Sequence, residues 1–415
     1  MAEGPAGEGL LPFTLAGWPV ARIADPYPVY RCYREAGSVH PGDGGWYVFG
    51  YQEVAQALAS PRLGRRAPRS GDGAQGQDPW EGAELAHPAV LDTAVRSLIA
   101  DWLVFLDPPR HTRLRAVLSH EFTPRVVTGL RARMAEIVTE LLGERRQLDL
   151  VEDFAAPYPV LVISELLGLP RADGGWLRER SLRLQQGSSS RAGQHPDAPA
   201  RADTAARELT DYFHDRLARR RARGSGTDLI GLLLAAGGLT TAEITATCIH
   251  LLTAGHETTT HLITKSALAL LDHPAVLAEL CDRPALVPDA VVELARYDAP
   301  VQAVTRWAQE DEQLGRHRIP RGTKLTLLLG AANRDPARFP HPDRLDPHRH
   351  PPAARHLAFG LGIHYCLGAA LARTEAEIAL AALLPRLAGA ALREAPVRYA
   401  PDLVFHGPER LLLGW

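Results

Sequence analysis

The stretch FGLGIHYCLG, from Phe359 to Gly368, is the part of this sequence that decides its fold. It places three glycines, a histidine and a cysteine directly before GAALARTEAEIALAALLPRL, which has strong helical character. Gly360 and Gly362 allow the backbone to turn tightly and to approach a flat partner closely. Cys366 lies at the N-terminus of the predicted helix, where free backbone N–H groups and the helix dipole favour an anion. The stretch therefore predicts a loop that holds a thiolate against a ligand.

The bulk composition is that of a chain with a large core and no excess of either charge. Of 415 residues, 46% are hydrophobic and 23% are charged, and the formal net charge is −2. These values argue against a nucleic-acid binder that relies on bulk charge. The cysteines are too scattered for a disulfide framework or a zinc site. Neither a leader nor a run of about 18 apolar residues is found, so we expect a soluble, cytoplasmic protein without membrane partners.

Helical periodicity dominates the chain, and the longest helical segment spans residues 240–274. Thr240 or Thr241 can cap its start and Pro274 closes it. Its centre is apolar on nearly every side, so we expect it to run through the interior. Two segments rich in glycine, proline and polar residues interrupt the periodicity. We interpret these segments, 61–88 and 185–204, as flexible loops that gate a binding site.

The pattern F-G-x-G-x-H-x-C-x-G closely resembles the haem-binding signature of the cytochrome P450 superfamily. The likeness runs from DPYPVY, at residues 25–30, to the C-terminus, and it is greatest to the soluble bacterial class. The resemblance implies a single triangular domain over residues 1–415. This domain would be mainly α-helical, with a small β-rich region.

The same resemblance implies haem b as cofactor and O2 as co-substrate. Cys366 would be the axial ligand, and a thiolate ligand pushes electron density onto iron and favours O–O cleavage. Phe359, Gly360 and Gly368 belong to the haem-binding signature around it.

The segment AGHETTT, residues 254–260, lies in the middle of the long predicted helix. The Thr258 hydroxyl can bond the carbonyl of Ala254, four residues earlier, which bends a helix. The resemblance places the acid–alcohol pair of the family on Glu257 and Thr258. Thr258 would hydrogen-bond dioxygen, and Glu257 would relay protons from solvent.

Two sets of charged residues are candidates for holding the haem and its loop. His111 and Arg115, four residues apart on a predicted helix, direct two donors to one side. The resemblance assigns them to one haem propionate, and Arg306 with His364 to the other. The alternative for such residues is a solvated basic face.

The sequence ELAR contributes Glu293 and Arg296, which are spaced for a carboxylate–guanidinium pair on one helical face. The family places this pair beneath the haem together with a further arginine, for which we expect Arg344. Their role would be structural, because they hold the loop that carries Cys366.

We expect a monooxygenase that inserts one oxygen atom into a bulky, largely apolar small molecule by hydroxylation or epoxidation, as in natural-product tailoring. No GxGxxG motif follows a predicted strand. Electrons from NAD(P)H would therefore arrive through a separate ferredoxin and ferredoxin reductase. Basic residues near the cysteine are candidates for docking that partner: Arg110, Arg113, Arg355 and Arg373.

The expected substrate pocket is apolar and rich in small residues. Gln302 is its candidate for orienting one polar group. One alternative function is a haem-thiolate enzyme that couples substrates or closes rings without inserting oxygen. Another is a haem-binding sensor without catalysis. The predicted pocket residues are Leu251, Ala254, Gly255, Ala299, Val301, Gln302, Ala303 and Val304.

Overall fold

The computed structural model of the protein describes residues 12–15, 18–42, 44–68, 94–188, 196–224, 226–349 and 355–415. The helices are α1 (Val20–Ile23), α2 (Tyr27–Ala36), α3 (Tyr51–Ala59), α4 (Ala94–Ile99), α5 (Arg110–Ser119), α6 (Pro124–Leu142), α7 (Pro157–Leu167), α8 (Gly174–Ser188), α9 (Ala198–Arg223), α10 (Leu229–Ala235), α11 (Thr241–Asp272), α12 (Pro274–Asp282), α13 (Val287–Tyr297), α14 (Leu329–Asn333) and α15 (Ala369–Leu387). The strands are β1 (Val39–Gly42), β2 (Gly45–Val48), β3 (Leu63–Gly64), β4 (Gln147–Asp149), β5 (Ala303–Ala308), β6 (Glu312–Leu314), β7 (His317–Ile319), β8 (Lys324–Leu328), β9 (Ala391–Leu392) and β10 (Leu412–Gly414).

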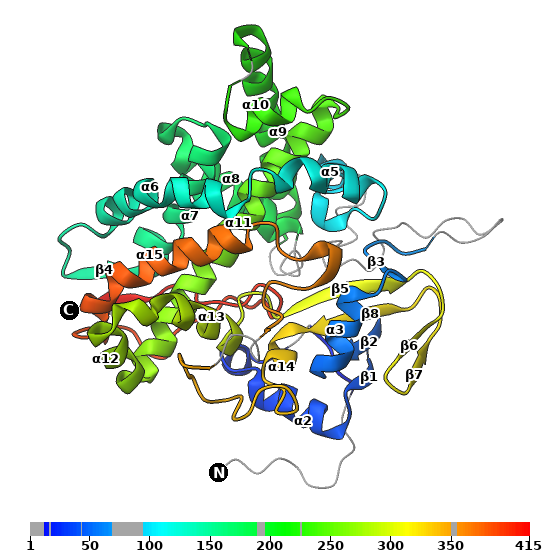
Figure 1. The fold of residues 1–415 in the computed structure, drawn as a ribbon, viewed down its shortest axis with the longest axis vertical. Helices are drawn as coiled ribbons and strands as arrows, with labels where there is room; N and C mark the ends of the chain where they lie inside the picture. Colours follow the sequence, from blue (N-terminus) through cyan, green and yellow to red (C-terminus); the bar gives the residue numbers. More distant parts are fainter. Residues whose placement is uncertain are drawn as a thin grey trace.

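The main sheet has five strands in the order β1-β2-β8-β5-β3, and it lies to one side of the helices (Figure 1). β2 and β8 are parallel, and the other neighbours are antiparallel. In the smaller sheets β10 pairs with β4 and β9, and β6 pairs with β7. The fold is therefore mainly α-helical with a small β-rich part, as the sequence predicts. Among the helices of the described residues, none combines the length and the hydropathy needed to cross a bilayer.

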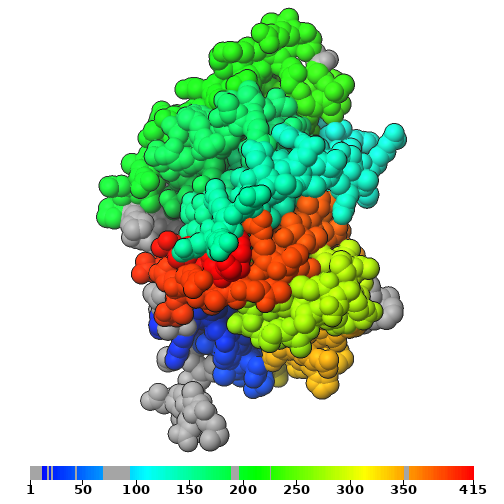
Figure 2. Space-filling view, turned by 90° about the vertical axis from the view of Figure 1, so that its left-hand side faces the viewer, coloured from blue at the N-terminus to red at the C-terminus, as the bar shows by residue number. Residues whose placement is uncertain are grey.

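Helix α11 runs through the centre of the molecule, where it contacts α7, α8, α9, α13 and α15 (Figure 1). Thr240 caps it in a capping box with Glu243, and His273 ends it ahead of Pro274. The predicted helix over 240–274 is thus confirmed. On the outside, α15 lies between α6 on one side and α12 with α13 on the other (Figure 2).

The predicted loop over 185–204 is wrong at both ends. Helix α8 continues to Ser188, and α9 begins at Ala198. Gly187 is the reason, because a Cβ at this position would meet the Ala202 Cβ at 2.3 Å and the Ala198 carbonyl oxygen at 2.4 Å. This glycine permits a close helix–helix contact, although in sequence it looks like a loop residue. Residues 69–88 and 189–195 of the two predicted loops lie outside the described residues.

A buried lysine joins α11 to two distant parts of the chain, the segment before β5 and the segment around His406. The Lys265 Nζ lies 2.8 Å from an Asp298 carboxylate oxygen, 2.8 Å from the Ala299 carbonyl oxygen and 2.6 Å from His406 Nδ1. Burial lowers the pKa of Lys265 to about 8, although Asp298 opposes the shift. Since His406 Nδ1 accepts from this amine, its Nε2 carries the proton and donates to the Ile23 carbonyl oxygen at 2.6 Å. All three N–H groups of the lysine are therefore used.

We predict that Lys265→Met destabilises the protein by about 1–3 kcal/mol, because the partly buried Asp298 carboxylate loses its nearest cation. Denaturant unfolding of the single variant and of Lys265→Met/Asp298→Asn measures this. The double variant should recover part of the loss, since no unpaired charge remains. A single variant as stable as the wild type would contradict the assignment.

Candidate active site

The loop before α15 has the tight geometry that its glycines predict. Gly360 and Gly362 have φ values of 70° and 73°, in the left-handed region that favours glycine. A Cβ at Gly362 would also meet the Leu58 carbonyl oxygen at 2.5 Å, so the loop lies directly against α3. The Cys366 N–H closes the loop by donating to the Phe359 carbonyl oxygen at 2.9 Å. The cysteine is thereby fixed by backbone contacts on both sides.

Cys366 is accessible, although protein closely surrounds it. Its side chain is exposed, yet the surrounding protein desolvates the thiol and raises its pKa. The Gly368 N–H, which bonds the thiol, and then Arg115 and Arg373 act in the opposite direction because they favour the thiolate. We infer that a side chain which is both accessible and closely surrounded borders an internal space, and we call this space the hollow.

Helix α11 packs against α15, the helix that follows Cys366, and part of its central turn is accessible. Ala254 is exposed in the middle of this buried helix, and Gly255 and Thr258 are half-buried. The Thr258 hydroxyl donates to the Ala254 carbonyl oxygen at 2.9 Å, which is the predicted bond. Glu257 is 5% exposed. Its Oε1 lies 3.9 Å from Nε2 of His261, one turn further along the helix.

Histidines and arginines converge beside the cysteine loop. The His111 and His364 rings lie 4.4 Å apart. Both His111 nitrogens and the His364 Nε2 are buried without a hydrogen-bond partner among the described residues. Burial, and then Arg306, Arg65, His111 and Arg115, lower the pKa of His364 to about 2. Such a cluster is rich in cations and is suited to a ligand that carries carboxylates.

Arg65 is a member of this cluster that the sequence does not reveal. It lies at the end of β3, inside a segment that reads as loop. Its guanidinium donates to the Thr305 carbonyl oxygen and, at 2.9 Å, to that of Val104. Asp107 is the carboxylate near His111, but its oxygens accept from the Arg65 backbone N–H. The cluster is still positive, because the guanidinium groups of Arg65, Arg115 and Arg306 outweigh this one carboxylate.

The predicted Glu293–Arg296 pair is buried and bidentate, with two contacts of 2.7 Å. The third member is Arg349, whose Nε lies 3.1 Å and 3.2 Å from the two Glu293 oxygens. The prediction of Arg344 is wrong, because Arg344 contributes its backbone carbonyl oxygen, 3.2 Å from Arg296. The Asp346 N–H bonds Glu293 at 3.1 Å. The chain turns at this contact, so Arg349, which follows the turn, faces the Glu293 carboxylate.

A run of hydrogen bonds connects this pair to the cysteine loop. Arg296 donates to the Asn333 carbonyl oxygen at 2.9 Å, at the end of α14. The Asn333 side chain accepts from the Leu357 N–H at 2.6 Å. The Leu357 carbonyl oxygen then accepts from the Gly360 N–H at 2.9 Å. The ion pair therefore fixes the start of the loop that carries Cys366.

The predicted wall over 299–304 points only partly toward the hollow. Val301 and Val304 are partly exposed, whereas Ala299 and Ala303 are fully buried. The expectation that Gln302 orients a ligand is wrong, because its side chain is fully buried and turned away. Its amide nitrogen donates to the Tyr27 hydroxyl at 3.1 Å and to the Ala299 carbonyl oxygen at 2.8 Å.

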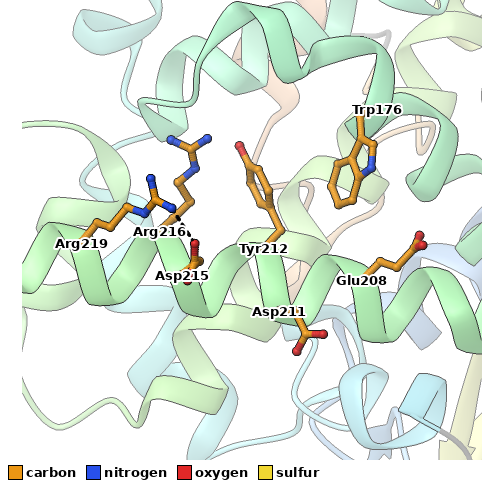
Figure 3. Close-up of a pocket in the computed structure, with 7 residues that line it drawn as sticks. All are labelled: Trp176, Glu208, Asp211, Tyr212, Asp215, Arg216 and Arg219. Atoms are coloured by element: carbon orange, nitrogen blue, oxygen red, sulfur yellow. Dashed lines mark hydrogen bonds and ion pairs between the residues drawn. The ribbon is translucent and has the colours of Figure 1, made fainter.

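A surface groove of about 560 Å³ between α8 and α9 is separate from this site. Figure 3 shows its aromatic residues, Trp176 and Tyr212, above the acidic side chains of α9. The guanidinium of Arg216 already lies over the Tyr212 ring, 4.9 Å from its centre, and also pairs with Asp173 at 2.7 Å. Its cations are thus engaged within the protein.

Known proteins share this sequence and fold. Residues 285–396 match the family model described as Cytochrome P450. The chain is 38% identical to cytochrome P450 monooxygenase PikC of Streptomyces venezuelae, over 94% of this chain and 91% of that protein. This chain belongs to the cytochrome P450 family. It is therefore an oxidoreductase of a haem-dependent family that uses O2.

Two other relatives of this cytochrome P450 differ in their chemistry. It is 37% identical to 6-deoxyerythronolide B hydroxylase of Saccharopolyspora erythraea, over 87% of this chain and 88% of that one. A solved structure, described as the cytochrome P450 enzyme CxnD for C–S bond formation in chuangxinmycin biosynthesis, superimposes with a TM-score of 0.81. It covers 94% of both chains at 33% identity.

The described residues fit the haem that the family implies. The thiol of Cys366 borders a hollow beside a loop that permits close approach. The cationic cluster leaves buried imidazole nitrogens unsatisfied, as expected if they face the carboxylates of a ligand. Haem b presents two propionates, which match a cluster of this composition.

We predict that Arg349→Ala lowers stability by about 2 kcal/mol, because Glu293 loses charge-assisted hydrogen bonds. It should also lower the haem content of the purified protein. Arg344→Ala is the matched control and should behave as wild type, since only its backbone contacts the pair. Thermal unfolding and haem absorbance per protein compare the two. Equal losses in both variants would contradict the assignment of Arg349.

Proposed function

We propose that this cytochrome P450 is a monooxygenase that inserts one atom of O2 into a bulky, largely apolar small molecule. The observation that supports this most is the thiol of Cys366, which borders a hollow near the open face of α11. We extend the proposal to the chain as a whole, as a single catalytic domain over residues 1–415.

In this proposal the Cys366 thiolate would hold the haem iron. Bound haem supplies the activation of O2, which a thiolate ligand favours. The Gly368 N–H favours the thiolate by bonding its sulfur. His111 and Arg115 hold one propionate, and Arg306 with His364 holds the other. Arg65 adds a further cation to the same cluster.

Thr258 and Glu257 would hold and transfer protons in the hollow. The Thr258 hydroxyl gives its hydrogen to the Ala254 carbonyl oxygen, which leaves its lone pairs directed at the open face of the helix. Glu257 lies beside it and can resupply a proton, and His261 is the next titratable group along the helix. The same residues exclude bulk water, since Glu257 and His261 are buried. General acid–base assistance is typically worth about 10²–10⁴-fold in rate.

The substrate is best described by the lining of the hollow. Ala254, Gly255, Val301 and Val304 supply small and apolar surface. The similar proteins include a hydroxylase named for 6-deoxyerythronolide B. We therefore propose hydroxylation or epoxidation in natural-product tailoring.

The electron donor would dock beside the cysteine loop. A groove of about 210 Å³ lies there, with Arg355 and Arg373 in its wall next to Phe359 and Tyr365. Arg110 and Arg113 are less available than the sequence indicates, because both bond Glu243. The proposed donor is an acidic ferredoxin, which a ferredoxin reductase supplies with electrons from NAD(P)H in the cytoplasm.

A second candidate function is oxidative bond formation without oxygen insertion. The likeness to CxnD favours it, because that structure is described as an enzyme for C–S bond formation. The presence of Thr258 and Glu257 in the open face of α11 favours monooxygenation. A haem sensor without catalysis would have no use for this pair.

We predict that the reduced carbonyl complex shows the red-shifted Soret band of thiolate ligation, and that Cys366→His abolishes it. Absorption spectroscopy measures this. Cys32→Ser, at an exposed thiol, should retain the band. A Cys366→His protein that keeps the band would overturn the ligand assignment.

We predict that Thr258→Ala lowers product formation about 10²-fold, while NAD(P)H consumption continues and peroxide is released. Thr253→Ala is the matched control, because Thr253 makes the same type of bond to Ile249, at 2.8 Å, but is buried. Product and peroxide per NAD(P)H are measured with redox partners. Unchanged coupling in Thr258→Ala would favour the bond-forming alternative.

A further inference from the structure

His250 lies on α11 one turn before Ala254, the residue that opens the helix toward the hollow. Residues four apart on a helix share a face. The imidazole is stacked on Trp102, with ring centres 5.0 Å apart and planes 20° apart. Trp102 directly precedes the 3-10 turn Leu103–Phe105, and it also stacks on Phe105. The stack holds both rings in one orientation, beside the face of α11 that carries the exposed Ala254.

Two polar atoms of this stack have no partner among the described residues. His250 is 7% exposed, and its Nδ1 is buried without a hydrogen-bond partner there. The indole N–H of Trp102 is also buried without an acceptor in the part of the chain that the structure describes. Buried polar groups are nearly always hydrogen-bonded in folded proteins. Two adjacent unsatisfied groups from different segments therefore point to a ligand.

The chemistry of the two rings defines what that ligand presents. Burial lowers the pKa of His250 to about 4, so the ring is neutral at neutral pH. A neutral imidazole has one donor and one acceptor, and an indole has one donor. Burial alone lowers the pKa of His250, and no charged side chain of the described residues contributes to the shift. A charged ligand group would therefore find no counter-charge. A hydroxyl or carbonyl oxygen satisfies the pair.

We infer that His250 and Trp102 form a polar subsite of the hollow that holds a neutral oxygen of the substrate. The indole N–H donates to this oxygen, and the imidazole donates to a carbonyl or accepts from a hydroxyl. The substrate class is then a bulky apolar molecule with a hydroxyl or keto group, in preference to a hydrocarbon. This inference rests on the proposed function, because it assigns the hollow to the substrate.

The test compares three ring compounds of similar size: cyclododecanone, cyclododecanol and cyclododecane. Calorimetry on the haem-loaded protein measures their dissociation constants without turnover. The wild type should bind the ketone and the alcohol about tenfold more tightly than the hydrocarbon, the value of one good hydrogen bond. His250→Phe and Trp102→Phe preserve an aromatic ring and should each reduce this preference.

His256→Phe is the matched control. His256 is also buried on α11 without a partner for either nitrogen, but it lies near Arg178 of α8. This variant should keep the wild-type preference. The subsite would be overturned if the wild type bound the three compounds equally well, as expected if water alone satisfies the two rings. It would also be overturned if His250→Phe and Trp102→Phe both kept the wild-type preference. If one of these two variants fails to fold, the other decides.

The reduced carbonyl spectrum separates this inference from the proposed function. Every folded variant here should show the same red-shifted Soret band as the wild type, since none of the three substitutions touches Cys366. A wild type without that band would tell against the monooxygenase assignment. A normal band without ligand preference would tell against the subsite alone.

Discussion

The Glu293–Arg296 ion pair is the constraint on which the position of the active-site thiol depends. Both side chains are almost completely removed from water, where separating them would leave a buried charge at a cost of about 3–5 kcal/mol. Because Arg296 also bonds the end of α14, the pair transmits its position to the Cys366 loop. The geometry of the thiol is therefore set by an interaction between elements far apart in the chain.

Helix α11, on the other side of the site, contains several residues that are poor helix formers. A threonine hydroxyl can compete with the backbone hydrogen bonds that form a helix. In α11 the hydroxyls instead donate to carbonyl oxygens four residues earlier, as those of Thr253 and Thr258 do. Burial and contacts with surrounding helices, among them α7, α9 and α15, then override the weak intrinsic propensity. The helix can therefore present small and polar groups to the hollow at its centre.

The sequence predicts the local features of this protein well. The glycine loop, the capped start of α11 and the Glu293–Arg296 spacing follow from backbone preference and helical periodicity, and the structure contains all three. Features that depend on distant contacts were missed. Arg349 replaces Arg344 because of a turn, and Gly187 packs between helices where a loop is predicted. Spacing along the chain carries no information on such contacts.

The Lys265 junction also bears on how substrate preference can change in evolution. Lys265, Asp298 and His406 fix the backbone before β5 through buried bonds that tolerate no single replacement easily. Val301 and Val304 lie just beyond, partly exposed and outside that junction. Their side chains can vary in size without disturbing the backbone that carries them. A buried charge junction next to partly exposed apolar positions would let the pocket change shape by single substitutions while the fold stays intact.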